Sequence, residues 1–153
     1  MGIRGHWRDG GATLALAPEA GAAAETAGGT AAGTARGTAA GAAAGTAGRP
    51  AEVPVEVAAS YRARTRGLLG RDGIEGAMLL TPAAGVHTFR MRFAIDVAYL
   101  DRHLKVIALT TMAPGRLGLP RPRARHVLEA EAGAMASWGL RVGSVLRLRP
   151  DSR

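Results

Sequence analysis

The stretch that decides the fold is residues 87–101, HTFRMRFAIDVAYLD, in which apolar and polar side chains alternate. Successive side chains of a β-strand point to opposite faces of a sheet, so the alternation predicts one or two strands with an apolar and a charged face. The apolar face, which we predict to be core, consists of Phe89, Met91, Phe93, Ile95, Val97 and Tyr99. The opposite face carries Thr88, Arg90, Arg92, Ala94 and Asp96.

Short segments with turn signals between them lie on both sides of this stretch. Alternation predicts further strands at residues 12–17, 52–58, 77–81, 105–112, 125–131 and 145–148. Ser60 is a typical N-cap for a helix over residues 61–69, which Gly70 ends, and residues 134–138 form one helical turn. The connection after residue 100 is too short for a crossover, so the strands on either side of it are antiparallel. The pattern predicts an α+β, β-rich domain with two short helices and a mostly antiparallel sheet or partly closed small barrel.

By composition the chain divides into three parts. Residues 1–17 form an N-terminal strand region, and residues 51–150 form a single compact domain. Residues 18–50 consist mainly of Ala, Gly and Thr, with a glycine at every fourth position from Gly29 to Gly45. In a helix each of these glycines would cost about 1 kcal/mol relative to alanine, and no apolar stripe offsets that cost. We therefore predict that this insert is disordered.

The 153 residues carry a formal net charge of +8, and nearly all of the basic side chains are arginines. Residues 51–153 hold sixteen basic and nine acidic side chains, a net charge of +7. This bias is typical either of a GC-rich genome or of a surface that binds phosphates, carboxylates or nucleic acid. No apolar run reaches the roughly 18 residues of a membrane helix, and no signal peptide is seen. We therefore expect a soluble protein without a membrane span, cytoplasmic by default.

Several catalytic and cofactor-binding patterns are missing from the sequence. It contains no cysteine, and its four histidines form no His-x-x-x-His pair, so no metal site is indicated. There is no Gly-x-Ser-x-Gly elbow, no Gly-x-Gly-x-x-Gly after a strand and no P-loop. The sequence therefore indicates no cofactor.

Four separated motifs resemble those of one known family. They are RTRGLLGR at residues 64–71, the stretch 87–101, RHVLEAEAG at residues 125–133 and GLRVG at residues 139–143. In order and approximate spacing they resemble the short-motif branch of an uncharacterised bacterial and archaeal family, domain-of-unknown-function family 192, over about residues 52–149. Many members have tryptophan in place of Arg90, the short branch often has proline in place of Ala94, and the Ala/Gly/Thr insert lies outside the family pattern. The resemblance implies a compact β-rich single domain and no known activity.

An arginine-rich set with one carboxylate is the best candidate for a binding site. Its members are Arg66, Arg71, Arg90, Arg92 and Asp96. In this hypothesis Asp96 orients two arginines toward an anionic ligand or toward the acidic surface of a partner. The alternative is that ion pairs such as Arg66–Glu129 or Arg92–Asp96 hold the fold, while the other arginines are solvated.

Three function hypotheses follow from these residues. The leading one is a non-catalytic binding module for an acidic partner surface or a small oxyanion. The second is single-stranded nucleic-acid binding, in which arginines and aromatic side chains stack on bases. The third is an enzyme of unknown reaction, in which Asp96 or Glu129 works as acid or base with His87 or His126. Whether the protein is an enzyme therefore stays open.

Overall fold

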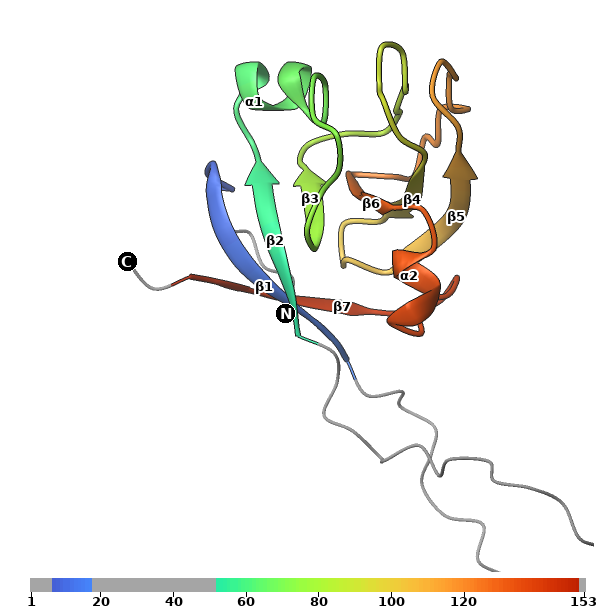
Figure 1. The fold of residues 1–153 in the computed structure, drawn as a ribbon. Coiled ribbons are helices and arrows are strands. Elements are labelled where there is room, and N and C mark those ends of the chain that lie inside the picture. Colours follow the sequence, from blue (N-terminus) through green and yellow to red (C-terminus); the bar gives the residue numbers. More distant parts are fainter. Residues whose placement is uncertain (1–6, 18–51, 152–153) are drawn as a thin grey trace, which may run out of the picture.

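The computed structural model describes residues 7–17 and 52–151, which form one curled β-sheet and two short helices (Figure 1). The strands are β1 (Gly10–Leu16), β2 (Val53–Ala58), β3 (Ala77–Leu80), β4 (Ile95–Leu100), β5 (Val106–Met112), β6 (His126–Glu131) and β7 (Leu146–Pro150). The helices are α1 (Tyr61–Arg66) and α2 (Ala134–Ser137), and neither is long and apolar enough to cross a membrane. Residues 1–6 and the predicted disordered insert, residues 18–50, lie outside the described residues.

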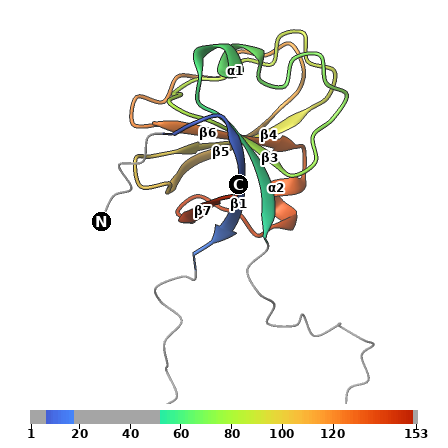
Figure 2. The same cartoon turned by 90° about the vertical axis from the view of Figure 1, so that its left-hand side faces the viewer.

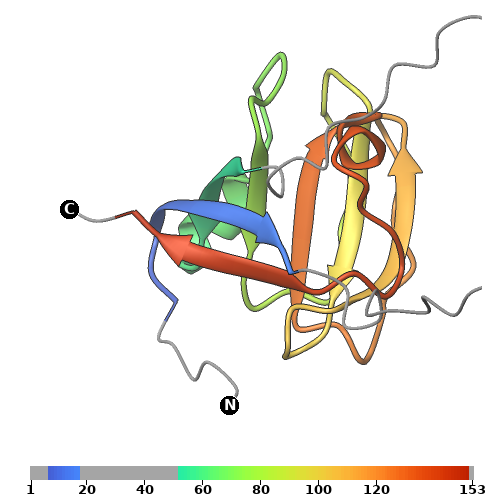
Figure 3. The ribbon, with the colours of Figure 1, turned by 90° about the horizontal axis from the view of Figure 1, so that it is seen from below.

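The seven strands lie side by side in the order β5-β4-β6-β3-β2-β1-β7. Every neighbouring pair is antiparallel except β2 and β3, which are parallel and joined by the crossover that contains α1. An isolated bridge between Lys105 and Val145 joins the starts of the two edge strands, β5 and β7. The sheet is therefore a half-barrel, in which β1 and β7 turn strongly against β4, β5 and β6 (Figure 2 and Figure 3). The predicted β-rich, mostly antiparallel fold is confirmed.

Two buried apolar clusters pack on opposite sides of strand β4, which lies between β5 and β6. Val97 and Tyr99 belong to one cluster, and Ala98 and Leu100 belong to the other, because successive side chains of a strand alternate. All six residues of β4 are buried. A strand with both faces buried has a nearly continuous apolar sequence, and β4 has one except for Asp96.

The prediction of a strand throughout residues 87–101 is wrong for its first half. β4 begins at Ile95, and residues 87–94 form turns and irregular backbone. Arg90 has a φ of 60°, in the left-handed region that strand residues do not occupy. Phe89, predicted to be core, is 46% exposed and stacks on the ring of His87. The other predicted core residues of the stretch are buried, apart from the half-buried Phe93.

Thr88 explains why the chain turns here instead of continuing as a strand. Its side chain is fully buried; the hydroxyl donates to the Ala113 carbonyl (2.7 Å) and accepts from the Arg116 amide (2.8 Å). Its carbonyl oxygen accepts from the amides of Met91 (3.2 Å) and Gly115 (2.7 Å). These bonds join residues 88–91 to the connection that follows β5. Contacts over such a sequence distance leave no trace in the alternation of residues 87–101.

Helix α1 begins where the sequence predicts and ends earlier. The Ser60 hydroxyl accepts a hydrogen bond from the Ala63 amide (3.1 Å), so the predicted N-cap is confirmed. The helix ends at Arg66 because Gly67 leaves helical geometry with a φ of 44°. The predicted end at residue 69 is therefore wrong, and residues 67–70 form turns.

Gly76, directly before β3, lies at a position where any other residue would be strained. Its φ is 73°, and a Cβ atom there would lie 2.1 Å from the Pro54 carbonyl oxygen. We expect Gly76→Ala to lower the free energy of unfolding by about 3 kcal/mol, since left-handed backbone costs alanine about 1–2 kcal/mol and the clash adds about 1–3 kcal/mol. Denaturant unfolding measures the loss. Gly70→Ala is the matched control, because Gly70 has a φ of 76° with open space around its Cβ position. Equal losses in both variants would contradict the steric explanation.

Candidate functional site

Two of the predicted binding arginines are held in ion pairs on the surface. Arg71 pairs with Glu56 (2.9 Å), and Arg92 pairs with Asp72 (2.8 Å). All four side chains are at least partly exposed, and exposed ion pairs contribute only about 0–1 kcal/mol to stability. The two guanidinium groups are therefore engaged, but weakly.

Asp96 is a structural carboxylate that binds no arginine in the described part of the chain. It is 5% exposed and accepts hydrogen bonds from the Thr111 hydroxyl (2.7 Å) and from the amides of Gly133 (2.9 Å) and Met135 (3.2 Å). These bonds tie β4 to β5 and to the start of α2. The alternative prediction of an Arg92–Asp96 ion pair is wrong, because both side chains have other partners.

Arg66 and Arg90 are the two predicted residues whose guanidinium groups have no partner within residues 7–17 and 52–151. Both side chains are exposed. The alternative Arg66–Glu129 ion pair is not formed either. The structure therefore does not bring the five predicted residues together around Asp96.

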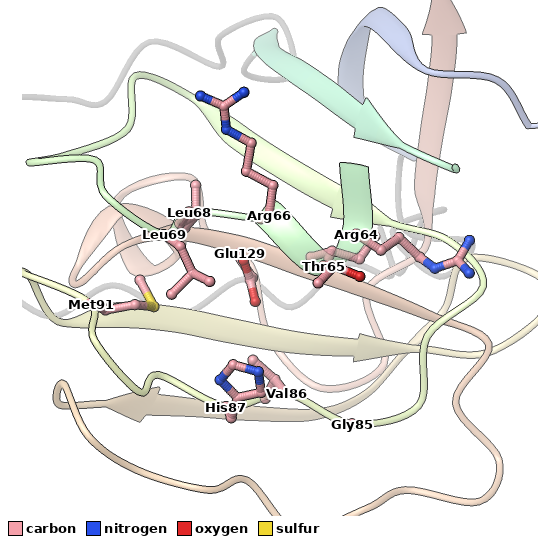
Figure 4. Close-up of a pocket in the computed structure, with 12 residues that line it drawn as sticks. Arg64, Thr65, Arg66, Leu68, Leu69, Gly85, Val86, His87, Met91 and Glu129 are labelled. Carbon is pink, nitrogen blue, oxygen red and sulfur yellow. The ribbon is translucent and has the colours of Figure 1, made fainter. Parts of the chain in front are cut away.

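A pocket of about 100 Å³ lies between α1, the turns that follow it and residues 85–91 (Figure 4). We call it the α1 pocket. Glu129 of β6 points into it, with His87 on the facing side. Of the acid–base residues in the enzyme hypothesis, the structure thus brings Glu129 and His87 to one pocket, whereas Asp96 and His126 do not line it. Its apolar lining includes Leu68, Leu69, Leu80, Val86 and Met91.

Glu129 has an unusual protonation equilibrium for a glutamate. The residue is 4% exposed, and burial raises the pKa of its carboxyl group from 4.5 to about 7. Loss of hydration disfavours the charged form, and within the described residues no hydrogen bond or ion pair compensates for that loss. Near neutral pH the pocket therefore holds a carboxyl group that readily gains or loses a proton.

His126 serves the core rather than the α1 pocket. Its Nδ1 atom lies 2.7 Å from the Thr81 hydroxyl, and the Trp7 ring packs against it edge-on at 5.5 Å between centroids. Burial lowers the pKa of His126 below its usual 6.5, so the ring is neutral at pH 7. Among the described residues, no group of three or more His, Asp or Glu side chains is arranged to hold a metal ion.

A basic groove runs between β5 and the connection that follows it. It consists of two hollows of about 430 and 550 Å³ that adjoin at Arg121, whose guanidinium lies over the Tyr99 ring at 5.6 Å. The described residues that line it include no Asp or Glu. We call this surface the β5 groove. Its basic side chains are Lys105, Arg116, Arg121 and Arg123.

The backbone of β5 is open along one side. Its partner in the sheet is β4, and the opposite side faces outward at the edge of the sheet (Figure 3). Within the described residues, the backbone bonds on that side are those of Val106 with Gly143 and Ser144. Alternate residues of the range 107–112 therefore present unpaired backbone N–H and C=O groups beside the β5 groove.

Comparison with known proteins agrees with the fold. The family model DUF192, an uncharacterised ACR, matches residues 42–148. The chain belongs to the DUF192 family. This DUF192 chain is 32% identical over 85 residues to a UPF0127 protein of Pyrococcus horikoshii, a match that covers 52% of this chain and 74% of that protein.

Two crystal structures resemble this DUF192 domain. One is a protein of unknown function from Novosphingobium aromaticivorans, with a TM-score of 0.56 and 20% identity over 65% of this chain and 79% of the other. The second is a Sinorhizobium meliloti 1021 protein whose name suggests a transcription regulator, with a TM-score of 0.58 and 15% identity over 94% of this chain and 98% of the other. At these identities the likeness shows the fold alone.

Sequence reasoning missed the β5 groove and the isolation of Glu129. The available signal for the groove is the Pro- and Arg-rich composition of residues 114–125, which carries no acidic residue. Nothing local distinguishes Glu129 from Glu131, because both occupy alternate positions of one short strand. Their difference arises from the apolar cluster that contains Val97 and Tyr99, which covers Glu129 and leaves Glu131 exposed.

Removal of the Asp96 carboxylate tests its structural role. We expect Asp96→Ala to lower the free energy of unfolding by about 3 kcal/mol, because the Gly133 and Met135 amides lose a charged acceptor in a buried place. Denaturant unfolding measures the change. Asp72→Ala, which removes the exposed partner of Arg92, should cost no more than about 1 kcal/mol. A loss at Asp96 as small as that at Asp72 would show that the buried bonds contribute little.

The raised pKa of Glu129 makes the stability of the fold depend on pH. The unfolded chain releases this proton near pH 4.5 and the folded chain near pH 7, so the folded state binds more protons between these values and stability falls as the pH rises. At about 1.4 kcal/mol per pKa unit, we expect a loss of about 3 kcal/mol between pH 4.5 and 8. Glu129→Gln should abolish this loss in unfolding experiments at several pH values. The exposed Glu131→Gln control should retain it; parallel curves for all three proteins would argue against a raised pKa.

Proposed function

We propose that this DUF192 domain is a non-catalytic binding module whose β5 groove takes up an extended, acidic segment of a partner protein. The observation that carries the proposal is the unpaired edge of residues 107–112 next to four basic side chains, with no carboxylate among the described residues that line the groove. An extended peptide pairs its backbone with such an edge and directs alternate side chains to one face. Glutamates or aspartates on that face would meet Arg116, Arg121 and Arg123.

Arg90 fits this surface through the turn that carries it. The Thr88 amide donates to the Arg116 carbonyl (2.8 Å), so the turn is bonded to the loop that lines the β5 groove. Asp96 contacts the same surface, because it accepts a hydrogen bond from Thr111 of β5, a residue that lines the β5 groove. Arg90 and Asp96, two of the three site residues predicted in residues 87–101, therefore have a place in the proposal.

The remaining predicted residues contribute general positive charge. Arg66 is an exposed guanidinium group on the α1 side, without a partner among the described residues. The exposed pairs of Arg71 and Arg92 can exchange their carboxylate for one of a partner at little cost. A protein with a net charge of +8 attracts acidic partners over distances of about a Debye length.

The β5 groove suits a peptide better than single-stranded nucleic acid. Base stacking needs an exposed aromatic face. Among the described residues that line the groove, the aromatic one is Tyr99, which is 1% exposed and covered by Arg121. The open backbone edge, by contrast, offers hydrogen bonds that a peptide can use.

Binding of a short peptide that alternates glutamate with threonine tests the proposal. We expect it to bind, with an affinity that falls as salt is added, because the charges are exposed. The double variant Arg116→Glu/Arg123→Glu should weaken binding about tenfold or more, since each reversal costs up to about 1 kcal/mol. Isothermal titration calorimetry or fluorescence anisotropy measures both effects. Arg62→Glu is the matched control, because Arg62 is exposed on α1 and does not line the groove.

Four further ligands decide whether the groove recognises a peptide strand. A lysine–threonine peptide should not bind, and citrate or a single-stranded oligonucleotide should bind more weakly than the acidic peptide. The acidic peptide with alternate backbone amides N-methylated should also fail, because it cannot pair with the edge of β5. Equal binding of the N-methylated peptide would show that charge attraction alone, without strand pairing, accounts for binding. Tighter binding of the oligonucleotide would overturn the proposal.

A further inference from the structure

Glu129 lies in the middle of an apolar cluster. Across the sheet it is opposite Met78 of β3 and Val97 of β4. Both neighbours, together with Val127, belong to the buried cluster on that side of the sheet. A carboxylate in such surroundings is costly unless a partner compensates its charge.

The buried threonine, histidine and aspartate side chains of the described residues all have hydrogen-bond partners. Thr81 and His126 contact each other at 2.7 Å, Thr88 binds two backbone segments, and Asp96 accepts three hydrogen bonds. Within residues 7–17 and 52–151, Glu129 has neither a hydrogen bond nor an ion pair. A native structure rarely leaves a buried polar group unpaired, so this exception points to a ligand.

The carboxyl group of Glu129 opens onto the α1 pocket. Among the described residues, every side-chain nitrogen or oxygen that is completely covered has a hydrogen-bond partner. The oxygens of Glu129 have no partner there, so they are not completely covered, and they border the pocket. Figure 4 shows the carboxyl group pointing into that space, between Leu69 and Thr65 and above His87. The Thr65 hydroxyl donates its proton to the Tyr61 carbonyl (2.8 Å), so it has none to donate to Glu129.

The arginines around the pocket do not neutralise Glu129. Figure 4 shows the guanidinium groups of Arg64 and Arg66 turned away from it. Arg64 instead donates to the carbonyl oxygens of Ala59 and Thr81. The cause of the raised Glu129 pKa is accordingly burial, without a contribution from a neighbouring charge. No cationic side chain of the described residues therefore pairs with Glu129.

We propose that the α1 pocket binds the ammonium head of a small primary amine, with the Glu129 carboxylate as its counter-charge. An ammonium group has three hydrogen-bond donors and no acceptor, and an ionised carboxylate is an acceptor alone, so the two groups satisfy each other. The apolar lining suits the short alkyl chain of such an amine. A cavity of about 100 Å³ is well below the 300–1,000 Å³ of sites for larger ligands, which restricts the ligand to a few heavy atoms. This site is separate from the β5 groove, and it does not depend on the function proposed there.

Amine binding should follow the ionisation of Glu129. The carboxylate form prevails above its pKa of about 7, and a primary amine stays protonated up to about pH 10. The other charged or titratable groups near Glu129 are His87, Arg64, Arg66 and Tyr99. We therefore expect binding to strengthen as the pH rises from about 6 to about 8.

Propylamine, propionate and propanol form a matched set of probes, because they share shape and differ in charge. Propylamine should shift the NMR signals of residues 65–69 and 85–91 at pH 8, and its affinity there should be about tenfold higher than at pH 6. Propionate and propanol should not shift these signals. Glu129→Gln should abolish the shifts, and the exposed Glu131→Gln should leave them unchanged. Leu69→Phe, which narrows the pocket and keeps the carboxyl group, should also prevent binding. A retained two-dimensional spectrum verifies that each variant is folded.

The same titration distinguishes the source of the amine. Binding of propylamine but not of Nα-acetyl-lysine amide would assign the pocket to a free small amine, whereas binding of both would allow a lysine side chain of a partner protein. Equal binding of propionate, or propylamine binding that survives Glu129→Gln, would overturn the proposal. Neither result bears on the acidic-peptide test, which uses different residues and a different ligand.

Discussion

The buried Asp96 carboxylate is the interaction on which the arrangement of this half-barrel depends. It binds the side chain of Thr111 and the amides of Gly133 and Met135, which are 15, 37 and 39 residues away in the sequence. Through these bonds one side chain of β4 fixes its neighbour β5 and the start of α2. Since α2 leads from β6 to β7, the same contact sets where the chain leaves β6 before β7 pairs with β1. A buried charge can hold three segments in this way because each hydrogen bond to it is stronger than a neutral one.

Asp96 and Glu129 lie on adjacent strands and illustrate two uses of a buried carboxylate. Asp96 has its full set of donors and faces the backbone of α2, so it is part of the scaffold. Glu129 faces Met78 and Val97, has no donor among the described residues and opens into a pocket. The first arrangement stabilises the fold, whereas the second destabilises it above pH 4.5. A buried carboxyl group that lowers the stability of the fold in this way is typical of a binding or catalytic site.

Both proposed sites are built by connections held on a rigid sheet. The α1 pocket lies between the turns after α1 and residues 85–91, and the β5 groove lies beside residues 113–123. Thr88 joins the two regions, because it bonds to Ala113 and Arg116 of the second connection. Binding residues on loops that a scaffold positions are common in proteins. In this DUF192 domain the sheet supplies the edge of β5 and the carboxyl group of Glu129, and the loops supply the surrounding charge and shape.

The sequence by itself determined the features that depend on neighbours in the chain. Alternation identified β2 through Val53, Val55 and Val57, the Ser60 cap located the start of α1, and separated motifs indicated the family. Local periodicity and capping are short-range, so these predictions did not need the fold. Only the tertiary structure decided that residues 87–94 turn, that Arg92 binds Asp72, and that Asp96 binds α2 while Glu129 is left without a partner among the described residues. These outcomes depend on which distant segments the curled sheet brings together, and the order of side chains along one strand does not contain that information.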